Sequence, residues 1–144
     1  MFKPRFLIGW IVGSALMFLC FYLFHGVLTN DFSKSGKVNK YFFEGAALAY
    51  IVTGYLIGML LSLSFLKSWI SNQAIRSLGV GCFCGMLVFG ITTISGQSLS
   101  GKPNMVNMAV DLCWQILEQS VGSFTFTFFS LNFRGSHIGD NDAL

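Results

Sequence analysis

Four long apolar stretches dominate the sequence, and each is long enough to cross a bilayer as a helix. They occupy residues 6–28, 42–66, 73–95 and 104–131. A helix needs about 20 consecutive apolar residues to cross a hydrocarbon core of roughly 30 Å. Because backbone groups in lipid must find their hydrogen-bond partners within the segment, such stretches fold as helices. The sequence therefore predicts an all-α integral membrane protein with four transmembrane helices.

Short polar connectors at residues 29–41, 67–72 and 96–103 separate these stretches. Short connections between long helices favour an up-and-down bundle, in which each helix runs antiparallel to the one before it. Hydrophobic residues make up 53 % of the chain and charged residues only 10 %, which is unlike a water-soluble domain of this length. We therefore expect one membrane domain over residues 1–144, ending in a polar tail at residues 132–144.

The charges that flank the stretches orient the chain only weakly. The two predicted sides of the membrane carry five and four basic residues, which are Lys3, Arg5, Lys67, Arg76 and Arg134 against Lys34, Lys37, Lys40 and Lys102. The first helix usually dominates the orientation, and basic residues stay in the cytoplasm. We therefore expect both termini in the cytoplasm, in a plasma or inner membrane, although the lysines of the first connector oppose this assignment.

Three of the four stretches contain two glycines separated by three residues. In lipid, apolar burial does not drive helices together, so small residues at this spacing promote association by letting two backbones approach closely. The pairs therefore predict close helix contacts, either within the chain or with a second copy or another subunit. They are Gly9 with Gly13, Gly54 with Gly58, and Gly81 with Gly85.

The fourth stretch differs from the others because it contains two acids, Asp111 and Glu118, seven residues apart. This spacing is nearly two helical turns and places both carboxyl groups on one helix face. A carboxylate at the bilayer centre costs at least about 2.5 kcal/mol, so this face should meet protein or water instead of lipid. Other polar or small residues lie within about 40° of the same line, and together they form what we call the fourth-helix stripe: Asn104, Asn107, Asp111, Gln115, Glu118, Gly122 and Thr125.

Helix direction predicts which polar residues share a depth with the stripe. His25 ends the first stretch and Glu44 begins the second, whereas Asp111 lies near the start of the fourth. Because successive helices alternate in direction, these three residues are expected at the same end of the bundle, where they could converge. Glu118 should lie deeper, and Trp114 flanks the stripe at a position from which it could cover a ligand.

Two interpretations of the stripe remain open. In the first, the chain is a small carrier or channel for a proton, cation or small solute. Asp111 and Glu118 would be the acceptors, Gln115 a neutral ligand and His25 a proton relay, since imidazole titrates near neutral pH. In the second, the chain is a non-catalytic subunit or assembly factor, and the stripe is a contact surface. The expected partners are the lipid bilayer and either a second copy or other membrane subunits.

Other chemistry is poorly supported by the sequence. Its four cysteines form no Cys-x-x-Cys pair, and its two histidines do not offer the paired axial ligands of a bis-His haem. Ligation of a haem or chlorophyll by His25 alone stays open, so the cofactor is unknown. No nucleophile and base pair or metal set is apparent, which makes an enzyme the weakest interpretation. The basic residues are scattered, so no nucleic-acid partner is expected.

Overall fold

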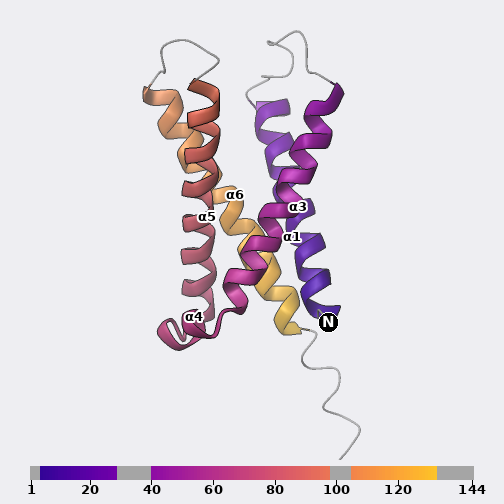
Figure 1. The fold of residues 1–144 in the computed structure, drawn as a ribbon, viewed down its shortest axis with the longest axis vertical. Coiled ribbons are helices and arrows are strands. Elements are labelled where there is room, and N and C mark those ends of the chain that lie inside the picture. The colour runs from indigo at the N-terminus through magenta and orange to yellow at the C-terminus, as the bar shows by residue number, and fades with distance from the viewer. Residues whose placement is uncertain (1–3, 29–39, 98–104, 133–144) are drawn as a thin grey trace, which may run out of the picture.

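A computed structural model describes residues 4–28, 40–97 and 105–132, and these ranges are helical except at Leu63 and residues 70–72, with no strands (Figure 1). The all-helical prediction is confirmed. Three segments of the described chain are long and apolar enough to cross a membrane: Pro4–Leu28, Tyr41–Ser62 and Gln73–Ile94. The helical elements are α1 (Pro4–Tyr22), the π-helix η1 (Leu23–Leu28), α3 (Lys40–Ser62), α4 (Ser64–Trp69), α5 (Gln73–Gln97) and α6 (Met105–Asn132).

Helix α6 is the most polar of the long helices. It has 28 residues, which is more than a bilayer requires. Its acids, amides and hydroxyl groups make it less apolar than the three segments that meet the criteria for a span. Its length alone therefore fits a crossing, whereas its composition requires that neighbouring helices or water cover its polar side.

The second apolar stretch differs from its predicted range, because its helix stops before the stretch ends. We expected one helix over residues 42–66, but α3 ends at Ser62 and Leu63 is extended, with φ −61° and ψ 127°. The Ser62 hydroxyl donates to the Gly58 carbonyl oxygen at 2.7 Å, a bond that competes with the helical backbone pattern. The chain then forms the short helix α4, which occupies part of the predicted turn at residues 67–72.

The long helices are arranged around α6, which crosses the bundle diagonally (Figure 1). Its most extensive contacts are with α5 and then with α1, while α3 packs mainly on α1. The start of α1 and the end of α6 lie at one end of the bundle. Toward the opposite end, α5 and α6 separate from α1 and α3 (Figure 1). This divergence leaves the first half of α6 with fewer covering helices than its second half.

All three glycine pairs lie at close contacts between helices of this chain, which confirms the predicted close packing. Those of α1 and α5 face α6, and that of α3 faces α1 and the Phe126 ring. A Cβ atom added at Gly81 would lie 2.5 Å from the Ser120 Cα atom, and one added at Gly85 would lie 2.6 Å from the Ile116 Cα atom. On the α1 side, a Cβ at Gly13 would lie 3.1 Å from the Gly122 carbonyl oxygen.

Hydrogen bonds between side chains and neighbouring helices supplement this packing. The hydroxyl groups of Ser77 on α5 and Thr127 on α6 are 2.7 Å apart, and the Ser123 hydroxyl donates to the Ser77 carbonyl oxygen at 2.7 Å. The Trp10 indole N–H donates to the Ile51 carbonyl oxygen at 2.7 Å and so joins α1 to α3. The bonds among Ser77, Ser123 and Thr127 satisfy buried polar groups that would otherwise lack partners.

Candidate functional site

Glu118 lies at the middle of α6 with none of its surface exposed. Its neighbours come from three helices: Cys20 on α1, Tyr50 on α3 and Trp114 one turn earlier on α6. The sequence predicted that this acid would avoid lipid, and the structure shows it enclosed by protein. A carboxyl group in such surroundings is costly unless it is paired, hydrogen-bonded or protonated.

The hydrogen bonding of Glu118 is incomplete. The Gln119 side-chain amide donates to Oε1 at 3.5 Å, which is at the limit of a hydrogen bond, and Oε2 has no partner among the described residues. The Tyr50 side chain lies close to both Glu118 and Gln115. The Trp114 side chain lies close to Glu118, but its indole N–H has no partner that meets hydrogen-bond geometry. The carboxyl group thus has polar neighbours without being fixed by them.

Two further buried oxygen atoms near Glu118 also lack donors within the described part of the chain. They are the side-chain carbonyl oxygens Oε1 of Gln115 and Gln119. Gln115 lies one turn before Glu118, and Gln119 follows it directly. We call Glu118, Tyr50, Trp114, Gln115 and Gln119 the Glu118 cluster. Because its unpartnered atoms are mostly acceptors, the cluster is suited to receiving a proton or another positive charge.

Exposure decreases along the fourth-helix stripe toward the Glu118 cluster. Asn107 and Asp111 are exposed, Gln115 is half-buried and Glu118 is buried. Asn104 lies outside the described residues. Asp111 shares a helix face with Glu118, and it lies on the half of α6 that diverges from α1 and α3 (Figure 1). The described conformation therefore leaves the stripe open toward the beginning of α6.

Beyond Glu118, the stripe is closed by close packing of α1 against α6. A Cβ atom at Gly122 would collide with the Met17 sulfur atom, and Met17 is completely buried. Gly13 lies against the Gly122 carbonyl oxygen at the same level. The Glu118 cluster is thus located where the open half of the stripe ends and the tightly packed half begins.

His25 and Glu44 are not brought into the Glu118 cluster. The end of η1, the beginning of α3 and the beginning of α6 lie at the same end of the bundle, as predicted (Figure 1). The His25 ring centroid is 5.0 Å from those of both Phe21 and Phe24, and Glu44 is exposed. Within the described ranges, no three His, Cys, Asp or Glu residues form a group that could hold a metal ion.

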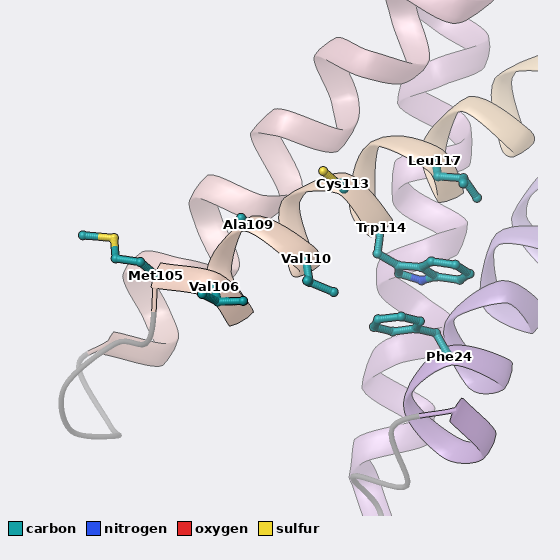
Figure 2. Close-up of a pocket in the computed structure, with 8 residues that line it drawn as sticks. All are labelled: Phe24, Met105, Val106, Ala109, Val110, Cys113, Trp114 and Leu117. Atoms are coloured by element: carbon teal, nitrogen blue, oxygen red, sulfur yellow. The ribbon is translucent and has the colours of Figure 1, made fainter.

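An apolar groove of about 600 Å³ runs along the first half of α6 and reaches the Glu118 cluster at Trp114. Figure 2 shows Met105 at one end of this groove and Trp114 stacked on Phe24 of η1 at the other. The two ring planes are 11° from parallel, with centroids 4.2 Å apart. Trp114 thus lines the groove and also lies close to Glu118, while its position beside a ligand stays a prediction. Phe24 was not anticipated.

The sequence did not indicate Tyr50 or Gln119 as members of the cluster. Tyr50 is one aromatic residue among many, and its proximity to Glu118 depends on the rotation of α3 about its axis. Gln119 is next to Glu118 in sequence, but it is displaced by about 100° from the stripe. No family model, curated protein or solved structure matches the chain.

Proposed function

We propose that the chain is a four-helix membrane bundle that carries protons, with Glu118 as the proton-binding group. In this proposal, α6 is the fourth span and both termini lie in the cytoplasm. The supporting observation is the complete burial of Glu118 at the middle of α6 with Oε2 unpartnered. Evolution rarely retains an acid at such a depth without a role, because burying it is expensive.

A proton suits the Glu118 cluster better than a metal cation does. Hard cations such as Ca²⁺ or Mg²⁺ need about six oxygen ligands and usually more than one carboxylate. The cluster supplies one carboxyl group and two amide oxygens without donors. A single carboxyl group is sufficient to bind and release a proton. The neutral oxygens of Gln115 and Gln119 then stabilise the protonated or hydrated group without competing for the proton.

The exposure of the stripe supports a carrier in preference to a continuous channel. Asp111 provides a charged entrance at the open end, and Gln115 leads from it to Glu118. Met17 and Gly122 close the path on the other side. A proton that binds from the open end therefore needs a change in the α1 and α6 contact before it is released at the opposite end.

Proton movement in liposomes tests this proposal directly. The purified chain is reconstituted with a trapped pH-sensitive dye, a pH gradient is imposed, and valinomycin with potassium compensates the charge. We expect the gradient to collapse faster than in empty liposomes. Asp111→Asn should slow the collapse only partly, since Asp111 concentrates protons at the entrance without binding the transported one. A rate equal to that of empty liposomes would contradict the proposal, and parallel assays with Na⁺ test a cation as the cargo.

The apolar groove supports a second candidate function, that of a subunit in a larger membrane complex. Its walls include Met105, Val106 and Val110, which are all more than half exposed. A helix of another membrane subunit would pack along this apolar groove by van der Waals contacts. Purification in a mild detergent distinguishes the two functions. The subunit function is favoured if a second chain copurifies in a fixed ratio. It is favoured further if a chain carrying both Asp111→Asn and Glu118→Gln still assembles with that partner and supports the activity of the complex.

A further inference from the structure

A second groove lies at the other end of the bundle, where α3, α4 and α5 meet. It has a volume of about 350 Å³ and is lined mainly by apolar side chains, including Leu60, Leu66, Val80 and Phe83. Among the described residues, Arg76 in the first turn of α5 is its one charged lining residue. An apolar groove with a single cation at its edge matches an amphipathic ligand that carries a negative head group.

The Arg76 guanidinium group has unused hydrogen-bonding capacity. One of its terminal nitrogens donates to the Ile70 carbonyl oxygen at 3.3 Å, and the buried Nε atom has no partner within the described chain. A guanidinium group carries five N–H donors and is always charged. The acidic residues of the described ranges are Glu44, near the beginning of α3, and Asp111 and Glu118 on α6. Arg76 is therefore available to an external anion.

Helix α4 has the features of a segment at the membrane surface. The rings of Phe65 and Trp69 stack at a centroid distance of 5.9 Å, and the two side chains are 68 % and 76 % exposed. Lys67 lies between them in sequence and is also exposed. Exposed aromatic residues beside a basic residue are typical of the region of lipid head groups. With the bundle placed in a membrane as proposed above, the neighbouring Arg76 would lie near the depth of lipid phosphates.

The wall of the groove continues from Arg76 along α5 toward the apolar part of the bundle. Val80 and Phe83 lie one and two turns after Arg76, which is about 6–10 Å further along the helix axis. Gly79 also lines the groove, and a Cβ atom added there would meet nothing within 4 Å. The groove thus combines a charged group at its outer end with an apolar surface that continues along α5 toward the middle of the bundle.

We propose that this groove binds a phospholipid, with its phosphate on Arg76, one acyl chain along Val80 and Phe83, and the exposed Lys67 of α4 adding positive charge at the same end of the bundle. Charge-assisted hydrogen bonds from the terminal guanidinium nitrogens to the phosphate would partner the charge of Arg76. Two cations with no described acid beside them favour an anionic lipid over a zwitterionic one. The proposal depends on the membrane placement of the bundle, but it does not depend on proton carriage by Glu118.

Native mass spectrometry of the full chain in detergent tests the lipid site, with phosphatidylglycerol titrated against phosphatidylcholine. We expect one tightly bound phosphatidylglycerol per chain. Arg76→Gln should weaken binding by about tenfold, which corresponds to losing one charge-assisted hydrogen bond. Gly79→Leu should weaken it similarly by filling the groove. Gly90→Leu is the matched control, because Gly90 is on the same helix and also has open space around it, and it should bind lipid like the unmodified chain.

Three results would overturn the lipid proposal. The first is equal phosphatidylglycerol affinity in the unmodified and Arg76→Gln chains. The second is displacement of the bound lipid by inorganic phosphate alone, which would indicate a site for a soluble anion. The third is a lipid affinity that rises tenfold or more, which is about 1.4 kcal/mol or more, when Asp140→Asn and Asp142→Asn are introduced together. That result would mean that the acidic C-terminal tail, and not a lipid, occupies the groove. A Glu118→Gln chain should bind the lipid with the same affinity as the unmodified chain. The lipid test therefore remains valid even if the chain does not carry protons.

Discussion

Replacing Gly81 with alanine is expected to lower the free energy of unfolding by about 1–3 kcal/mol, and replacing Gly85 as well should lower it further. The new methyl groups would lie 2.5 Å from the Ser120 Cα atom and 2.6 Å from the Ile116 Cα atom. These are backbone atoms, so a rotamer change cannot relieve the clash. The whole of α6 would have to move away from α5, which would also stretch the bonds from Ser77 to Thr127 and Ser123.

Unfolding of the purified chain in mixed micelles, followed by circular dichroism as the denaturing detergent is increased, measures this loss. Gly90→Ala is the matched control, since it changes the same helix at a position where a Cβ atom meets nothing within 4 Å. It should change stability by no more than about 1 kcal/mol, the difference in helix propensity between glycine and alanine. Equal stability of the Gly81→Ala and Gly90→Ala chains would contradict the close packing of α5 on α6.

Much of the fold was predictable because apolar length and glycine spacing are local properties of the sequence. The four long helices follow from residue hydrophobicity, and the glycine pairs indicate where backbones approach. The sequence did not determine which helix each pair contacts, and Gly81 with Gly85 could equally have faced another chain. The break at Leu63 was missed because no proline or glycine marks it. The Ser62 hydroxyl bond to Gly58 offers a local reason for the break, but the same bond also occurs inside continuous helices, as at Thr125.

The residues that α6 contributes to the candidate site were largely predictable from the sequence, whereas those contributed by other helices were not. An acid at the centre of an apolar helix must be covered, and Glu118 is indeed buried by neighbouring protein. The same argument grouped Asp111 with Glu118 by helix face, but it could not show that the neighbouring helices diverge and leave Asp111 exposed. Tyr50 joins the cluster through the rotation and tilt of α3. Such tertiary relations between helices are not encoded in the periodicity of any single helix.

Glu118→Met is expected to raise the free energy of unfolding by about 1–3 kcal/mol, because it removes a buried polar atom that has no partner. Methionine has a similar length and adapts to irregular apolar space. The same substitution should reduce proton flux to that of empty liposomes, since no proton-binding group remains at this depth. Glu118→Gln should abolish flux as well, while leaving stability closer to that of the unmodified chain because the amide retains polar contacts with Tyr50 and Gln119.

The combination of higher stability and lost flux separates a functional acid from a structural one. If Glu118 joined the helices by hydrogen bonds, methionine would leave Tyr50, Trp114 and Gln119 without their shared partner, and stability would fall. A loss of stability comparable to that of Gly81→Ala would therefore assign Glu118 to helix packing, and persistent flux in either variant would exclude it as the proton carrier. Residues that destabilise the fold are retained where activity needs them, and under the proposal of proton carriage Glu118, whose Oε2 atom has no partner among the described residues, is such a residue.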